Sequence, residues 1–420
     1  MQNLQISLKD VKSIIICLIP LFILTGPFLP DLSVVIVDIL FLYFCFKEKN
    51  WDCFKNKFFK IFLIFYFYLV LISFFSENII HSLSSSIFYI RFGIFALALY
   101  YIISEDKSFI TKFSSYFLIT MIFASVYGLS EYSIHYLSEE TETFRMSLPF
   151  NDKQVLGGFL VRFLPLIFAF WLINKKKIYN LYIFIPIILI IYLCILLSGE
   201  RLAIGLLIIS SIFIFFTLNI SKRLLVILAV VFMTSFLSIS YFNKDFRDRN
   251  ILSTLNGFGL TNFESVEFSN TNSLQIFTPI YDSHIRGAFN MFTNNPIFGV
   301  GPNQFRNLCI SPEYNINLMT CSTHPHNTYI QLLAETGIIG FLFVFVIFII
   351  ISYLIFKHSI FKLFSKNLIY TNYQILIMIC FFITLWPIAP SHNFFNNWIN
   401  ILYYIPVGFF IASVSQVRNK

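Results

Sequence analysis

The sequence predicts an all-α polytopic membrane protein with about twelve transmembrane helices and a large structured outside loop. Three observations predict this class. Hydrophobic residues make up 57% of the 420-residue chain, whereas charged residues make up 12%. That charged share is about half of what a soluble domain carries. The apolar residues also form long runs, and Lys and Arg gather on alternate connections between these runs.

Each apolar run is about long enough to cross a hydrocarbon core of about 30 Å as a helix. The expected spans are residues 13–30, 32–46, 60–76, 86–104, 114–136, 156–173, 181–198, 202–220, 224–241, 338–356, 372–390 and 398–415. They divide the chain into a first set of spans over 1–241, an outside loop over 242–336 and a last set over 337–420. An even number of spans would place both termini on one side.

The basic residues predict the orientation of these spans. Most of the 29 Lys and Arg residues lie on the side that the N-terminus shares, including Lys175-Lys176-Lys177. Because Lys and Arg are enriched in cytoplasmic loops, we expect both termini in the cytoplasm. The basic clusters then determine topology among membrane lipids, and no nucleic-acid partner is expected.

The long outside loop contains two expected amphipathic helices. It also holds a polar stretch at Ser269-Asn270-Thr271-Asn272-Ser273. Ser283 is the expected N-cap of the first helix, since apolar residues follow at helical spacing and Arg286 falls on the polar face. The second helix is expected to start near Pro325, because proline suits a first helical turn. Its polar stripe would be Asn327, Gln331 and Glu335, and Gly337 would interrupt it before the next span.

Cys309 and Cys321 are the cysteine pair of the large outside loop. An oxidising compartment favours a disulfide between them. The alternative is two unpaired thiols. The bridge would close the segment directly before the histidines at 324 and 326.

Four arginines lie where basic residues are disfavoured. Arg201 occupies a tight outside turn, Arg286 lies on the outside loop, and Arg91 and Arg162 fall inside spans. Guanidinium offers a rigid fork of donors matched to phosphate oxygens, so an arginine at this interface could bind a lipid phosphate. The alternatives are an ion pair with Glu200 for Arg201, a solvated surface position for Arg286, and structural pairing for Arg91 and Arg162.

His326 is the candidate general base, because imidazole titrates near neutrality. His324 would point elsewhere, since a helix turns about 200° over two residues. The sequence has no spacing typical of a metal site, so neither a metal ion nor another cofactor is expected. It also lacks a glycine-rich nucleotide loop before a helix.

Several segments in order resemble motifs of the O-antigen ligase and polymerase superfamily of bacterial membrane glycosyltransferases. They are Arg145 with Phe150-Asn151-Asp152-Lys153-Gln154-Val155-Leu156-Gly157, then Ser198-Gly199-Glu200-Arg201-Leu202, then Arg286 with Asn295-Pro296-Ile297-Phe298-Gly299-Val300-Gly301-Pro302, and then His324-Pro325-His326-Asn327-Thr328-Tyr329 with Glu335-Thr336-Gly337. The blocks cover residues 145–340. The long outside loop agrees with the same family.

The resemblance implies a metal-independent, inverting glycosyltransferase of the GT-C type in the bacterial inner membrane. Such an enzyme transfers a glycan from undecaprenyl diphosphate to an acceptor hydroxyl on the periplasmic face. It implies that Arg201 and Arg286 hold the diphosphate and that His326 activates the acceptor. The same resemblance suggests substrate-binding or supporting positions, which are Arg145, Asn327, Gln331 and Glu335. Arg162 is a further substrate-binding candidate, because a charged residue inside a span implies a role.

The acceptor stays open at this point. A ligase of lipopolysaccharide biosynthesis would transfer to lipid A-core, a polysaccharide polymerase would extend a lipid-linked repeat, and some relatives glycosylate proteins. We favour the ligase type slightly, because the histidine motif comes just before a late span. The rival from another class is a polysaccharide flippase, for which polar groups at mid-membrane would be expected.

Reporter fusions test the orientation. We expect alkaline phosphatase to be inactive when fused after Lys175, Lys222, Lys362 or Lys420 and active after Asn270. Activity at Lys362 together with inactivity at Asn270 would reverse the topology.

Overall fold

The computed structural model describes residues 8–138, 144–174, 181–218, 222–257, 260, 278–364 and 367–418. Within these ranges the chain is helical and has no β-strand, only one isolated bridge between Leu148 and Asn151. In chain order the helices are α1 (Leu8–Ile23), α2 (Phe28–Glu48), η1 (Asp52–Lys55), α3 (Lys57–Ser73), α4 (Ile79–Ile87), α5 (Ile90–Glu105), α6 (Phe109–Leu137), α7 (Leu156–Asn174), α8 (Leu181–Leu197), α9 (Arg201–Thr217), α10 (Lys222–Phe242), α11 (Lys244–Arg247), η2 (Asp248–Leu252), α12 (Ser253–Gly257), α13 (Pro279–Asn294), α14 (Phe305–Leu308), α15 (Thr328–Leu363), α16 (Asn372–Thr384) and α17 (Asn397–Arg418).

The prediction of an all-helical, multi-pass membrane protein is confirmed at this level. Every expected span overlaps a helix. Six helices of the described chain are long and apolar enough to cross a membrane, namely Phe28–Glu48, Ile79–Glu105, Phe109–Leu137, Leu156–Asn174, Thr328–Leu363 and Asn397–Ser415. Shorter apolar helices accompany them, at Tyr182–Leu197, Arg201–Thr217, Ala229–Phe242 and Asn372–Thr384.

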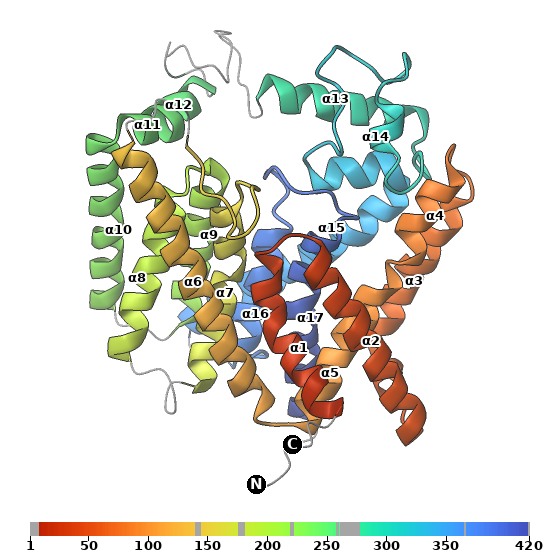
Figure 1. Ribbon diagram of the computed structural model, residues 1–420, viewed down its shortest axis with the longest axis horizontal. Helices are drawn as coiled ribbons and strands as arrows, with labels where there is room; N and C mark the ends of the chain where they lie inside the picture. The colour runs from red at the N-terminus through yellow and green to blue at the C-terminus, as the bar shows by residue number, and fades with distance from the viewer. Residues whose placement is uncertain are drawn as a thin grey trace.

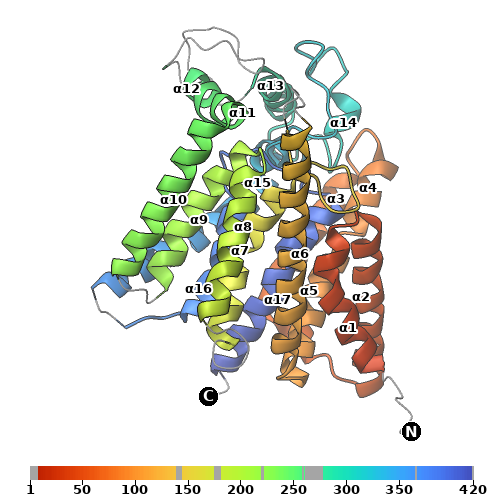
Figure 2. The ribbon, with the colours of Figure 1, turned by 60° about the vertical axis from the view of Figure 1, so that its left-hand side comes forward.

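The helices run between two distinct ends of the molecule (Figures 1 and 2). The start of α1 and the end of α17 lie at the same end of the molecule. Helices α11 to α14 lie at the opposite end, which we call the loop end. The polar stretch at 269–273 and the lysines at 175–177 lie outside the described residues.

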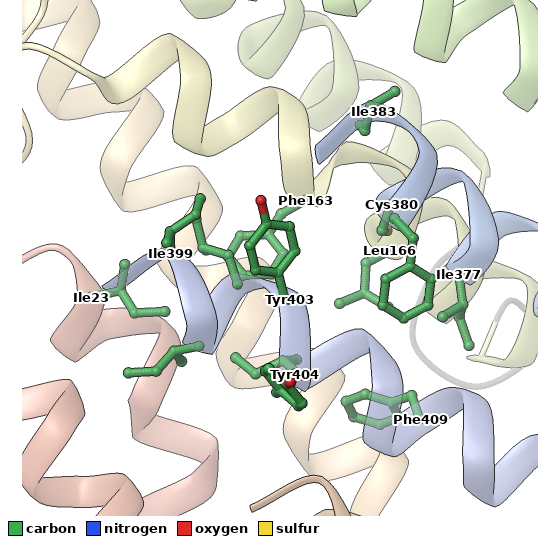
Figure 3. Packing of buried hydrophobic residues seen from close by; sticks show 14 of the residues in the cluster. Ile23, Phe163, Leu166, Ile377, Cys380, Ile383, Ile399, Tyr403, Tyr404 and Phe409 are labelled. Carbon is green, nitrogen blue, oxygen red and sulfur yellow. The ribbon is translucent and has the colours of Figure 1, made fainter. Parts of the chain in front are cut away.

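Aromatic packing fills the centre of the bundle. Helix α17 packs against α5, and α16 packs against α7. Figure 3 shows buried residues of this packing, among them Phe163 of α7, Cys380 of α16 and Tyr403 of α17. One turn or two further along, the ring of Phe409 lies 5.0 Å from those of both Phe113 and Phe170. Since lipid is as apolar as these side chains, their close packing, more than the hydrophobic effect, holds the helices together.

Helices α13 and α15 begin at other residues than the sequence predicts. Helix α13 begins at Pro279 with Thr278 as its N-cap residue, and Ser283 is buried one turn inside, where its hydroxyl donates to Pro279 O. Helix α15 begins at Thr328, not near Pro325, and the side chain of Asn327 accepts from the N–H groups of Tyr329 and Ile330. His326 has φ of 55°, a left-handed conformation that a right-handed helix cannot include.

Gly337 breaks α15 into two segments, as the sequence predicts. It has φ of 63° and ψ of −169°, and a Cβ atom there would overlap the carbonyl of Ile297. The break frees backbone groups that a continuous helix would pair, and the loop before α14 pairs with them. Val300 N and Gly301 N donate to the carbonyls of Ala334 and Glu335, at 2.9 and 3.0 Å. The kink therefore docks the loop on α15, which keeps its polar groups satisfied.

Substitution of Gly337 tests this docking. We expect Gly337→Ala to lower the thermal unfolding midpoint in detergent, because a left-handed backbone with a side chain costs about 1–3 kcal/mol and the new Cβ also overlaps the loop. Gly205→Ala in α9 is the matched control, since no atom lies within 4 Å of the added Cβ. Equal midpoints for both variants would contradict the packing described for the kink.

Candidate active site

The histidine motif lies at the loop end in an irregular segment before α15. The rings of His324 and His326 have centroids 4.1 Å apart. The expectation that His324 points elsewhere is therefore wrong, because it assumed that both histidines lie in a helix, whereas α15 starts only at Thr328. The positive φ of His326 turns its ring back onto that of His324. Strained backbone of this kind persists only where surrounding structure enforces it.

Helix α13 adds two rings to this pair. His284 stacks on His326 with centroids 5.3 Å apart, and Tyr281 lies 4.8 Å from His326. His284 is 4% exposed. The sequence reasoning missed it, although a signal existed. His284 shares the buried helix face with Ala288 and Met291, four and seven residues further on, and a histidine on an apolar face needs a reason.

Hydrogen bonds distinguish the two motif histidines. Both ring nitrogens of His324 are engaged, Nδ1 with the Thr323 hydroxyl at 2.9 Å and Nε2 with the carbonyl of Ser391 at 3.0 Å. In His326 only Nε2 is engaged within the described chain, with the Ser322 hydroxyl at 3.2 Å. His326 is also partly exposed, whereas His324 is buried. His326 is thus better placed to meet a substrate.

The histidines are neutral at pH 7. Burial, followed by the charges of its neighbours His324 and His284, lowers the pKa of His326 to about 3. Burial lowers the pKa of His324 to about 4, against a hydrogen bond to Ser391 that raises it. Burial also lowers the pKa of His284. A neutral imidazole can accept a proton, so the cluster has the protonation state that a base requires.

The loop between α16 and α17 holds the histidine motif in place. Ser391 N donates to the carbonyl of His326 at 2.8 Å, and the hydroxyl of Thr328 donates to that of Ser391 at 2.8 Å. The amide of Asn327 donates to Pro387 O at 2.7 Å. These bonds fix the backbone of the motif from both sides. Asn327 therefore acts as helix cap and as anchor at once.

The next turn of α15 also contacts the loop between α16 and α17. Gln331 donates to Asn393 at 2.8 Å and to Glu335 at 2.9 Å, and it accepts from Phe394 N at 2.9 Å. Glu335 is 1% exposed, and its two oxygens accept from the backbone N–H groups of Asn303 and Phe305 at 3.0 and 2.9 Å. Asn327, Gln331 and Glu335 form the predicted polar stripe, but they are buried and bond to neighbouring loops. Gln331 and Glu335 position the surrounding loops.

A second group of candidate residues surrounds the turn between α8 and α9. Gly199, at φ of 72°, lies against the backbone of Phe144 and Arg145, and Met146 N donates to Ser198 O at 3.1 Å. This pairing brings Arg145 beside Glu200. Arg201 begins α9 and is partly exposed.

Glu200 and Arg162 meet at the first turn of α7. Both carboxylate oxygens of Glu200 accept from Gly158 N, at 3.1 and 3.2 Å, and Arg162 donates to Gly158 O at 2.8 Å. Burial raises the pKa of Glu200 to about 7, against the Gly158 hydrogen bond and the charges of Arg162 and Arg145, which lower it. The structure thus places Arg145 and Arg162 near the carboxyl group of Glu200, and Arg201 follows Glu200 in the chain.

Arg286 and Arg91 have other partners. Arg286 forms an ion pair of 2.7 Å with Asp282, one turn earlier in α13, and its side chain is 67% exposed. An exposed pair of this kind contributes little to stability, so it leaves Arg286 available to a ligand. Arg91 pairs with Asp31 at 3.0 Å and donates to Asn397 at 2.6 Å. That arginine has the structural pairing that the sequence left open.

A disulfide joins Cys309 and Cys321, whose Cα atoms are 5.1 Å apart. It closes the segment before the histidine motif at the loop end. Cys17, Cys45, Cys53, Cys194 and Cys380 are free thiols. Among the described residues, no three His, Cys, Asp or Glu side chains are arranged to hold a metal ion, the histidine cluster included.

The fold and these two groups of residues define a multi-pass membrane protein with a polar site at its loop end. A family model described as O-antigen ligase matches residues 185–345. The match confirms the resemblance to the O-antigen ligase and polymerase superfamily, and it contains Arg201, Arg286 and His326. It supports a function of the ligase or polymerase type on lipid-linked glycan in the membrane. No curated protein matches the chain significantly.

Replacement of Glu335 tests its positioning role. We expect Glu335→Gln to lower the thermal unfolding midpoint in detergent, because an amide NH₂ would face backbone donors and leave one unsatisfied, at a cost of about 1–3 kcal/mol. Glu313→Gln is the control in the same loop, where an exposed carboxylate accepts from the side chain of Asn294 at 2.6 Å. If the two variants unfold alike, Glu335 does not fasten the loop.

Proposed function

We propose that this protein transfers a glycan from undecaprenyl diphosphate to an acceptor hydroxyl on the periplasmic face of the inner membrane. One observation carries the proposal most directly. Within the segment that matches the O-antigen ligase family, a neutral and conformationally strained His326 lies among fixed polar groups at the loop end. The glycan is activated already, so no nucleotide is needed on that side of the membrane.

The reaction we propose is a direct displacement with inversion. The acceptor oxygen forms a bond to the anomeric carbon as the bond from that carbon to the phosphate oxygen breaks. The electron pair leaves with undecaprenyl diphosphate, and the acceptor proton passes to His326. No metal ion takes part in this scheme. Its rate depends on stabilising the charge that develops on the diphosphate.

His326 supplies the base. With a pKa of about 3 it is neutral at pH 7 but accepts a proton weakly. An arriving diphosphate brings negative charge close to the ring, and such charge raises the pKa of an imidazole. His326 would therefore become a stronger base only when the donor is bound. This coupling disfavours proton uptake in the empty site.

Arg201 and Arg286 are the proposed diphosphate ligands, and Arg145 and Arg162 support them. Guanidinium groups bind phosphate oxygens in pairs of parallel hydrogen bonds. Arg201 directly follows Glu200, near which Arg145 and Arg162 lie, whereas Arg286 lies on α13 beside the exposed carboxylate of Asp282. Asn327, Gln331 and Glu335 hold the frame in which His326 works. The acceptor we propose is lipid A-core, as for a ligase, and a lipid-linked repeat would make the protein a polymerase.

The decisive experiment is transfer by His326→Ala in membranes supplied with lipid-linked donor and each acceptor. We expect a loss of about 10²–10⁴-fold, the usual contribution of a general base. Donor binding should persist, because the arginines are intact. The product formed by wild type decides between ligase and polymerase.

His324→Ala is the comparison. His324 is bonded through both nitrogens and acts through the position of His326, so a smaller loss is expected at equal protein level. A larger loss for His324→Ala than for His326→Ala would move the base to His324. Normal transfer by both variants, with altered movement of lipid-linked glycan, would replace this proposal by a transporter.

A further inference from the structure

His392 belongs to the loop between α16 and α17, which holds the histidine motif in place. Neither the sequence motifs nor the family match includes this residue. Its neighbour Ser391 is bonded to the His326 carbonyl, to the His324 ring and to the Thr328 hydroxyl. Three bonds to one residue leave the next residue little freedom. His392 is therefore held at a defined place beside the candidate base, yet its side chain remains partly exposed.

The ring of His392 connects this loop to α7. It packs edge-on against Trp398 with centroids 5.3 Å apart, and Trp398 lies 6.3 Å from Phe159. Phe159 directly follows Gly158, the residue that binds both Glu200 and Arg162. His392 thus lies between the histidine cluster and the group of arginines.

The surroundings of His392 are positive. Burial has the largest effect on the pKa of His392, and the charge of Arg162 has the next largest. Together with smaller effects from His324, Lys153 and His326, they lower this pKa to about 3. Arg162 itself is 5% exposed, and its Nε atom is buried without a hydrogen-bond partner in the described chain. Glu200 is the nearby acid, and its oxygens already accept from Gly158. A buried guanidinium donor with no acceptor indicates a site that an anion completes.

We propose that His392, together with Arg162, binds the diphosphate of the donor. The inference rests on the proposed function for the identity of the anion. The imidazole of His392 donates an N–H to a phosphate oxygen and takes up a proton as the diphosphate binds, and Arg162 supplies a second positive charge. In the transfer step, His392 stabilises the phosphate oxygen that takes the electron pair of the broken bond, while the acceptor proton goes to His326. The two histidines then serve opposite sides of one reaction.

The test measures binding of undecaprenyl diphosphate and undecaprenyl monophosphate to the full-length protein in detergent by calorimetry. We expect His392→Ala to bind the diphosphate about tenfold to a hundredfold more weakly, since hydrogen bonds to charged groups contribute about 1.5–3 kcal/mol. Preference for the diphosphate over the monophosphate should shrink. His392→Gln keeps an N–H donor of similar reach and should retain most of the affinity.

A second readout separates binding from a purely structural role. Heats measured in buffers of different ionisation enthalpy report the protons taken up on binding. A diphosphate beside His392 raises the pKa of that ring, so proton uptake should be lower in His392→Gln than in wild type. His358→Gln is the matched control, since His358 is a buried histidine near the far end of α15, and it should bind like wild type.

The inference is overturned if His392→Ala binds undecaprenyl diphosphate like wild type. It is also overturned if affinity falls while proton uptake stays unchanged and the unfolding midpoint drops, because His392 would then only support the loop. Failure of the proposed function looks different. In that case wild type binds the diphosphate through His392 but transfers no glycan from lipid-linked donor.

Discussion

The break of α15 at Gly337 is the constraint on which the loop end depends. A helix in lipid must satisfy every backbone group internally, and a break is tolerated only where other protein supplies the missing partners. Here the segment 296–301 supplies them, and Glu335 extends the contact to Asn303 and Phe305. The first segment of α15 can therefore lie under the loop end, with the histidine motif at its start.

Burial of the histidine cluster has a chemical consequence. Rings packed on one another at about 4 to 5 Å cannot all be charged in a site of low dielectric, so they stay neutral. The hydrogen bonds of His324 and His326 differ. His324 is fully engaged in holding Ser391, and His326 keeps one nitrogen for a substrate. The same stacking that keeps His326 neutral also orients its ring.

The candidate arginines come from several elements. Arg145 comes from the connection before α7, Arg162 from α7, Arg201 from α9 and Arg286 from α13. Glu200 offsets part of the charge and fixes the first turn of α7. An arrangement with more guanidinium groups than carboxylates suits a phosphorylated lipid better than a neutral sugar.

The sequence alone determined the helical spans, because long apolar runs can satisfy their backbone in lipid only as helices. It also predicted the break at Gly337, which the structure confirms, and it singled out His326 and Arg201 as candidate site residues, since their residue types are unusual at those places. It placed the starts of α13 and α15 wrongly and separated His324 from His326, because helix ends depend on φ angles that tertiary contacts impose. Only the tertiary structure brought His284 onto His326 and placed the loop of His392 beside the histidine motif. These residues are more than 40 positions apart in the chain, and the packing of α13 and of the last loop on α15 decides where they lie.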